Sequence, residues 1–376
     1  MPGWVGILLF VLGVLIMILA HEAGHFLTAK WFGIKVEEFF VGFGPRLWSF
    51  RRGETEYGIK AIPAGGYVRI AGMNPFQEPA PEDRDRVFTA KPAWQRAIVL
   101  VTGSLTHFVL AFLTLVVIFG VVGQASRFRP QVVAVERQLD GVASPAFQAG
   151  LRPGDQVVAV AGQPVDYESF SGAVTRSVGR EVTLVVQRDG RELRLRMEPV
   201  LSEVEGRRIG RLGVVVSPGE VLARQRAGPL ETVQRSAEFT GRMVVGSFQA
   251  IGRVFGPEGL GRLGELLGGD RRRLDDPVGI VGAARVSGQA VQAGQFESFL
   301  LLFAFFNVFV GIVNLLPLPP LDGGHLAVLA WEKVTGRRVD PRKLIPITAV
   351  VAGFLILFTI SMLYLDVVRP LPNPFG

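Results

Sequence analysis

The stretch WVGILLFVLGVLIMILAHEAGH, from Trp4 to His25, decides the architecture of this chain. Its first part is uncharged and apolar as far as Ala20, which is typical of a helix that spans a membrane. The run continues without a break into His21, Glu22 and His25. Histidines four apart on an α-helix lie on one face, about 6 Å apart along the axis. Both imidazoles can therefore reach one metal ion, and the glutamate between them can sit beside a water on that ion.

The alternative is a chance match in a helix whose polar residues merely face other helices. Two histidines and a glutamate within five residues of membrane-spanning sequence would then be an unexplained cost, because ionisable groups are expensive inside a bilayer. This cost favours a functional site.

Composition indicates a membrane protein with a sizeable soluble part. Of the 376 residues, 49% are hydrophobic and 19% are charged, against roughly 25% charged in a typical soluble domain. The first apolar run lacks a basic start and a small-residue cleavage site, so we do not expect a cleaved signal peptide. Uncharged stretches long enough to span a bilayer predict four transmembrane helices, at Trp4–Ala20 (extended by the motif to Ala29), Ala97–Val122, Phe299–Leu316 and Leu344–Leu365.

The distribution of basic residues orients these spans. Lysines and arginines are frequent between the first two spans, from Lys30 to Lys91, and again between the last two, from Lys333 to Lys343. By the positive-inside rule both connections are cytoplasmic, so we expect both termini and the long segment Gly123–Ser298 to be extracytoplasmic. This topology accounts for the net charge of +7, and nothing in it indicates nucleic-acid binding. Because the chain has no cysteine, zinc ligands must be histidines or carboxylates.

A second constellation follows the third apolar stretch, where the sequence from Asn314 to His325 reads NLLPLPPLDGGH. Three prolines within four positions break the helix, and broken backbone at membrane depth is tolerated where it is buried or lines a polar cavity. Asp322 would then complete a set of three protein ligands with His21 and His25, which is typical of a catalytic zinc. Alone, the segment would more simply be a turn at the membrane surface. The first motif favours the metal site.

The two motifs, in this order and on the first and third of four spans, resemble the site-2 protease family of intramembrane zinc metalloproteases. Within it the chain resembles the bacterial regulator-of-sigma-E-type enzymes. The resemblance implies that His21, His25 and Asp322 bind Zn²⁺ and that Glu22 is the catalytic acid/base. It also implies that Asn314 lies near the substrate backbone. The implied substrates are single-span transmembrane proteins, such as anti-sigma factors and leftover signal peptides, cut in regulated intramembrane proteolysis at the inner membrane with release of a cytosolic fragment.

Two segments near the motifs bear on this resemblance. Gly42–Pro45 and Glu56–Val68 predict short strands, and the family has a membrane-associated β-hairpin here whose edge could pair with an unwound substrate. A plain cytoplasmic hairpin is the alternative.

The second span departs from the family, which often has Gly-Pro-x-x-Asn where this chain has Gly103-Ser-Leu-Thr-His107. We interpret His107 as a buried histidine bonded to a neighbouring helix rather than a ligand.

The extracytoplasmic segment resembles a PDZ domain through the turn Ala149–Asp155 and the strand pair Glu181–Arg188 and Glu192–Met197. Such a domain binds an extended peptide or a C-terminus, or here excludes bulky ectodomains; the sequence leaves both roles open. Leu230–Val254 predicts an amphipathic helix that lies on the outer leaflet or packs against the PDZ domain. Residues 256–276, rich in glycine and charge, predict a linker.

The sequence thus predicts a polytopic α-helical membrane protein with four transmembrane helices, a membrane-associated β-hairpin and an extracytoplasmic α+β PDZ domain. The predicted function is that of a metalloendopeptidase acting within the lipid bilayer. A catalytically silent PDZ-bearing scaffold is the alternative, and Glu22 argues against it because a structural zinc site has no need of that carboxylate. The predicted boundaries are 1–30 for the first helix, 31–93 for the hairpin loop, 94–123 for the second helix, 124–222 for the PDZ domain and following strands, 223–298 for the amphipathic and linker region, 299–332 for the third transmembrane segment and 333–376 for the fourth helix and tail.

Overall fold

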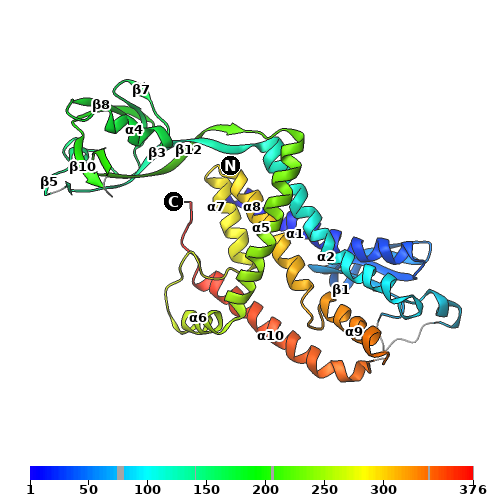
Figure 1. Cartoon of the computed structure of the whole chain (residues 1–376). Coiled ribbons are helices and arrows are strands. Elements are labelled where there is room, and N and C mark those ends of the chain that lie inside the picture. The colour runs from blue at the N-terminus through cyan, green and yellow to red at the C-terminus, as the bar shows by residue number, and fades with distance from the viewer. Residues whose placement is uncertain (74–79, 140, 205–206, 338, 376) are drawn as a thin grey trace. The chain divides into compact units, whose positions relative to one another are not determined.

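The chain forms two compact units, shown in Figure 1. The computed structural model describes residues 1–73, 80–139, 141–204, 207–337 and 339–375. One unit, here named the helical unit, combines Met1–Ile118 with Pro229–Gly376. The other, named the β-rich unit, is Phe119–Gly228 and is an insertion between the two parts of the first.

Within the described residues, four helices are long and apolar enough to cross a membrane, as the sequence predicts. They are α1 (Gly3–Trp31), α2 (Ala93–Val116, extended by a π-helical turn at Val117–Val122), α8 (Phe296–Asn314) and α10 (Pro341–Val368). Between α8 and α10 lies a shorter helix, α9 (Asp322–Thr335). The break between α8 and α9 falls on the prolines that predicted it.

Small residues let the helices of this unit approach closely. A Cβ at Gly24 of α1 would lie 2.7 Å from the Thr102 carbonyl oxygen of α2. Likewise, a Cβ at Gly6 would lie 2.6 Å from the Ser287 carbonyl oxygen of α7 (Ile280–Gln292). Such contacts bring backbones together where apolar burial alone gives no drive for helix association in lipid.

A β-hairpin connects α1 to α2 and contains the two predicted strand segments. Its strands are β1 (Val36–Arg52) and β2 (Thr55–Ile70), with short 3₁₀ turns at Pro81–Arg86 and Phe88–Ala90 before α2. The first half of β1 is paired on both flanks, because Phe39 lies opposite Val68 on one side and Tyr57 on the other. The hairpin therefore folds back on itself into a small sheet rather than a simple ribbon.

The prediction of a linker at residues 256–276 is wrong in part, because Pro257–Gly268 forms the helix α6. Its leucines recur at helical spacing, and Leu266 is fully buried against Met362 and Leu365 of α10. The glycines masked this periodicity in the sequence. The preceding helix α5 (Pro229–Phe255) occupies the predicted amphipathic segment and packs along α2 and α8.

A buried ion pair joins the end of α10 to the segment before α7. The Asp366 carboxylate accepts a hydrogen bond from Arg272 Nη1 (2.9 Å), and both side chains are almost fully buried. Asp366 also accepts from the backbone N–H of Gly282 (2.7 Å) in the first turn of α7. It thus satisfies a backbone donor that has no partner within its own helix.

The β-rich unit is a twisted antiparallel sheet covered by short helices. Its sheet order is β12-β3-β6-β8-β9, with β7 beside β6, and residues such as Val157, Leu184 and Val186 form the core. The predicted strand pair Glu181–Arg188 and Glu192–Met197 is present as two adjacent antiparallel strands, Val182–Arg188 and Arg191–Met197. The elements are β3 (Gln124–Val135), β4 (Gln138–Leu139), β5 (Val142–Ala143), α3 (Pro145–Gln148), β6 (Gln156–Val160), β7 (Gln163–Pro164), α4 (Tyr167–Thr175), β8 (Val182–Arg188), β9 (Arg191–Met197), β10 (Val200–Val204), β11 (Arg207–Arg211) and β12 (Val214–Gln225).

An ion pair fixes the turn at 149–155. Arg188 donates from Nε and Nη2 to the two carboxylate oxygens of Asp155, each at 2.6 Å, and Asp155 also accepts from the backbone N–H of Arg152. Burial alone would raise the pKa of the Asp155 carboxyl, but the hydrogen bonds and charge of Arg188, with Arg152, hold that pKa below its ordinary value. A further bond from Arg188 Nη2 to the Gly150 carbonyl (2.8 Å) closes the turn.

This geometry predicts a pH-dependent stability of the β-rich unit. Because the folded pKa of Asp155 is depressed, its stabilisation is present above the unfolded pKa near 4 and is lost as pH falls through the folded value. We expect Arg188→Ala to cost roughly 2 kcal/mol at pH 7, typical of hydrogen bonds to charged groups, and to weaken this pH dependence. Hydrogen exchange of β8 amides in the full chain at pH 7 and at about pH 2 measures both, with Arg191→Ala at an exposed position as control. Equal effects of the two substitutions would contradict the assignment.

Candidate metal centre

Two ligand candidates lie near the end of α1 that leads into the hairpin. His21 and His25 are one turn apart, as their spacing predicts, and their Nε2 atoms are 3.2 Å from each other. His25 is buried and His21 is half-buried. The two rings meet edge to face, with their centroids 4.7 Å apart.

Asp322 reaches the same point from the first residue of α9. Its Oδ2 lies 3.5 Å from His21 Nε2 and 3.4 Å from His25 Nε2. The two glycines that follow allow this approach, because a Cβ at Gly323 would lie 2.2 Å from the Leu315 carbonyl oxygen and one at Gly324 would lie 2.3 Å from the Pro319 nitrogen. The loop before α9 thus folds tightly under its first turn and aims the carboxylate at the histidines.

The spacing of these three atoms fits a tetrahedral zinc ion. Ligands at 2.0–2.1 Å in a tetrahedron are about 3.3 Å apart, and the three observed separations are 3.2, 3.4 and 3.5 Å. Asp322 Oδ2 is also buried without a hydrogen-bond partner among the described residues, which a cation between the ligands would resolve. His21, His25 and Asp322 are the group of metal-ligating side chains found in the described part of the chain.

The other nitrogen of each histidine is also engaged. His25 Nδ1 lies 2.7 Å from the Val99 carbonyl oxygen, and His21 Nδ1 lies 3.1 Å from Nε2 of His107 on α2. His107 is almost fully buried and is not part of the ligand group. The interpretation of His107 as a buried histidine bonded to a neighbouring helix agrees with this contact.

Glycine at position 103 makes room for the metal ligands, which the sequence alone did not reveal. A Cβ on Gly103 of α2 would lie 2.1 Å from His25 Nε2, closer than any carbon can approach without displacing the ring. Because the collision depends on how α1 packs against α2, no local pattern could have identified Gly103.

Glu22 lies outside the ligand group and approaches the hairpin. The backbone N–H of Val68 in β2 donates to its carboxylate. Gly66 permits this approach, because its Cβ would already lie 3.2 Å from Glu22 Cγ. The predicted acid/base therefore lies between the ligands on α1 and the strand β2.

Asn314 ends α8, eight positions before Asp322, and is outside the ligand group. Its side chain is half-buried and has no hydrogen-bond partner among the described residues. An amide with free donors and acceptor near a break in the backbone is compatible with the predicted contact to a substrate.

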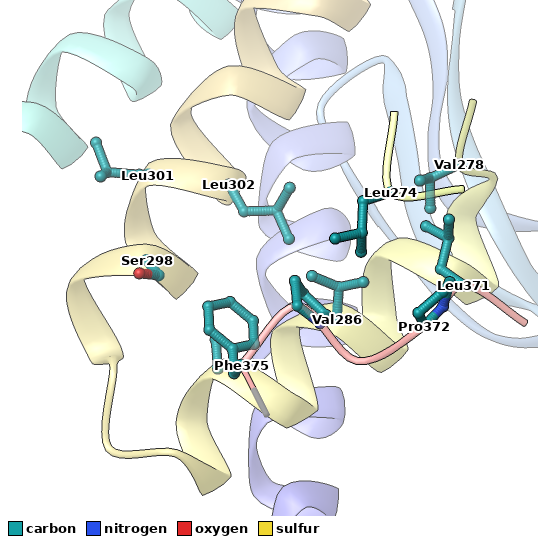
Figure 2. Close-up of a pocket in the computed structure, with 11 residues that line it drawn as sticks. Leu274, Val278, Val286, Ser298, Leu301, Leu302, Leu371, Pro372 and Phe375 are labelled. Carbon is teal, nitrogen blue, oxygen red and sulfur yellow. The ribbon is translucent and has the colours of Figure 1, made fainter. Parts of the chain in front are cut away.

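A separate cavity of 420 Å³ lies between α7, α8 and the C-terminal tail (Figure 2). Among its labelled side chains in Figure 2, Ser298 alone is polar, and none of the lining residues is a metal-ligand candidate. Its chemistry provides no group for hydrolysis. It is lined by Leu274, Val278, Val286, Ala290, Ser298, Leu301, Leu302, Leu371, Pro372, Pro374 and Phe375.

Comparison with known proteins identifies the family. Residues 9–359 match peptidase family M50. The chain belongs to this family. It is 34% identical to zinc metalloprotease Rip1 of Mycolicibacterium smegmatis over 413 aligned positions, which cover 98% of each chain. Identity to zinc metalloprotease Rip1 of Mycobacterium tuberculosis H37Rv is also 34%, over 97% of this chain and 98% of that protein. A putative zinc metalloprotease of Agrobacterium fabrum, Atu1380, is 32% identical over 87% of this chain and 86% of that protein.

Membership confirms the resemblance that the paired motifs carried. This peptidase family M50 protein is a membrane-embedded zinc metalloendopeptidase of the site-2 protease type. Zn²⁺ is its cofactor, in agreement with the donor set and spacing of His21, His25 and Asp322.

The packing around His25 generates a prediction. We expect Gly103→Ala to weaken zinc binding by about 10-fold or more, the loss typical when the surroundings of a metal ligand are disturbed. The physical reason is the 2.1 Å approach of the new methyl group to His25 Nε2. Zinc per chain after dialysis against a chelator measures it. Gly353→Ala on α10, where a Cβ meets nothing within 4 Å, is the matched control, and equal retention in both variants would refute the packing argument.

Proposed function

We propose that His21, His25 and Asp322 bind the catalytic Zn²⁺ and that Glu22 transfers protons during hydrolysis of peptide bonds within the bilayer. The observation that carries the proposal is the 3.2–3.5 Å spacing of three ligand atoms from two distant parts of the chain. When bound, zinc supplies Lewis acidity that activates a water and polarises a carbonyl.

Glu22 has a distinct task in this proposal. It lies next to His21 on α1 but outside the ligand group, so its carboxylate is free to accept a proton from the attacking water and return it to the leaving amine. The N–H of Val68 orients it. Asn314 holds the substrate backbone through its unpaired amide.

The strand β2 supports an extended substrate beside this site. A peptide bond in a helix is shielded and internally hydrogen-bonded, so a transmembrane substrate must unwind locally before it is cut. An unwound segment can pair with a strand edge, and the Gly66–Val68 part of β2 approaches Glu22. We propose that the hairpin is membrane-associated and presents the substrate in this way.

The proposed substrates are single-span membrane proteins, namely anti-sigma-factor-like regulators and signal-peptide remnants. The enzyme acts in the bacterial inner membrane in regulated intramembrane proteolysis, with both termini and the β-rich unit extracytoplasmic. The clusters of lysine and arginine in residues 30–91 and 333–343 support this orientation.

We assign the β-rich unit as a PDZ domain. Support comes from the turn at 149–155, which the ion pair between Asp155 and Arg188 stabilises, and from the helix α4 beside the sheet. The domain recruits an extended peptide or a C-terminus, or it excludes substrates with large ectodomains. A catalytically silent PDZ-bearing scaffold is the rival function, and the carboxylate of Glu22 beside an open ligand set argues against it.

The division of roles between Glu22 and Asp322 gives a direct test. We expect Glu22→Gln to lower the cleavage rate by about 10²- to 10⁴-fold, the range of general acid–base catalysis, with zinc retained. Asp322→Asn should lose zinc as well as activity, because an amide oxygen is a poorer ligand than a carboxylate. Cleavage of a single-span substrate in proteoliposomes and metal analysis of the same preparations measure both. Wild-type activity in the first variant or unchanged zinc in the second would remove that residue from its role.

The proposed topology is tested with single cysteines, since the chain has none of its own. In intact cells, a membrane-impermeant maleimide should label Glu192→Cys in the β-rich unit and spare Arg84→Cys between the first two spans. Both side chains are exposed, so accessibility within the protein does not limit the reaction. Labelling of both after permeabilisation is the control, and the reverse pattern in intact cells would overturn the orientation.

A further inference from the structure

His107 is a buried histidine whose surroundings give it a specific task. It lies on α2 with 2% of its surface exposed, and its Nε2 is 3.1 Å from His21 Nδ1. Neither the ligand group nor the proposed proton transfer uses it. A buried polar ring is costly unless its nitrogens are paired, so both of its partners matter.

If His21 binds a metal, only one of the two histidines can be the donor in the hydrogen bond between His21 and His107. His21 Nε2 faces His25 and Asp322, so metal binding needs its lone pair there and a proton on Nδ1. His21 Nδ1 therefore donates, and His107 Nε2 accepts. This requires His107 to be neutral with its own proton on Nδ1.

A complementary acceptor is available for that proton. Asn307 of α8 is fully buried and close to His107. Its Nδ2 donates to the Phe303 carbonyl (2.9 Å), which turns Oδ1 the other way. His107 Nδ1 and Asn307 Oδ1 are both buried without a hydrogen-bond partner among the described residues, and one can donate where the other can accept. Gly311, one turn after Asn307, lets α8 approach, because its Cβ would lie 3.0 Å from His107 Cβ.

We propose that His107 and Asn307 are positioning residues that hold His21 in its metal-binding tautomer and orientation. The chain of donors runs from His21 Nδ1 to His107, from His107 to Asn307, and from Asn307 to the Phe303 carbonyl of α8. It links three membrane-spanning helices to one metal ligand. The inference rests on the proposed role of His21 as a ligand, and it assigns a function to the position where this chain departs from the Asn of the family pattern.

One rival acceptor lies nearby. The carbonyl of Gly103 is also close enough to His21 to accept a hydrogen bond. It already accepts the Thr106 hydroxyl at 2.7 Å, which weakens it as a partner. If this carbonyl were sufficient, His21 would keep its orientation without His107, and the experiment below separates the two.

The test measures zinc affinity of the purified full chain by competition with a chromophoric chelator of known zinc affinity. We expect His107→Phe, which keeps a ring but offers no acceptor, to weaken zinc binding by about 10- to 100-fold, as is typical for loss of an outer partner of a metal ligand. His107→Gln, whose side-chain oxygen can accept near the Nε2 position, should recover most of the loss. Ser104→Ala, one turn earlier on α2 and equally buried, is the packing control and should bind zinc like the wild type.

The role of Asn307 is tested by non-additivity. Asn307→Leu should weaken zinc binding less than His107→Phe, and the double variant should be no weaker than His107→Phe alone, because both act through one chain of hydrogen bonds. Additive losses would show independent packing defects and overturn the proposal. So would equal losses in the Phe and Gln variants, or wild-type affinity in His107→Phe, which would favour the Gly103 carbonyl.

A last arm separates this inference from the function on which it rests. His21→Ala must abolish tight zinc binding if His21 is a ligand at all. Loss in His21→Ala with wild-type affinity in His107→Phe overturns only the positioning role. Retention of zinc in His21→Ala overturns the ligand assignment itself. If His107→Phe does not fold, Asn307→Leu and His107→Gln carry the comparison.

Discussion

The convergence of three electron-pair donors on one point constrains most of the helical unit. Two imidazole nitrogens and a carboxylate oxygen lie 3.2–3.5 Å from one another. The two histidines lie on the same face of α1 because they are four residues apart in an α-helix. The carboxylate comes from a different part of the chain, so α1, α2 and the loop before α9 must pack to within a few tenths of an ångström.

Three glycines lie where backbone elements approach closely around this point. A methyl group would lie 2.1 Å from His25 Nε2 at Gly103, 2.7 Å from the Thr102 carbonyl at Gly24, and 2.2 Å from the Leu315 carbonyl at Gly323. The first two approaches join α1 and α2, and the third joins α9 to the residue that follows α8. These glycines therefore allow the backbones to pack closely around the metal centre. They do not indicate flexibility, because two of the three lie inside membrane-spanning helices.

The sequence predicted those features that depend on residues close together in the chain. The four spans follow from length and composition, and the pairing of His21 with His25 follows from helix spacing. Asp322 was predicted as a ligand because it follows a helix broken by prolines. Broken backbone at membrane depth must be buried in protein or line a polar cavity, which indicates a site formed by packing between helices. The helix α6 escaped prediction because glycines interrupt its leucines, and its stability comes from burying Leu266 on α10. Gly103, and the partner of His107, depend on the packing of α1 against α2 and could not be read from either helix alone.

The division of the chain separates the chemistry from the rest of the protein. Every proposed ligand, Glu22, Asn314 and His107 lie in the helical unit, although the β-rich unit is inserted between its two parts. The insertion is closed at its base, because β3 and β12 pair along their length down to Gln124 and Gln225. The chain thus leaves and re-enters the helical unit through adjacent strands. The three proposed metal ligands therefore come from the helical unit alone, although the chain that joins α2 to α5 forms a separate compact unit.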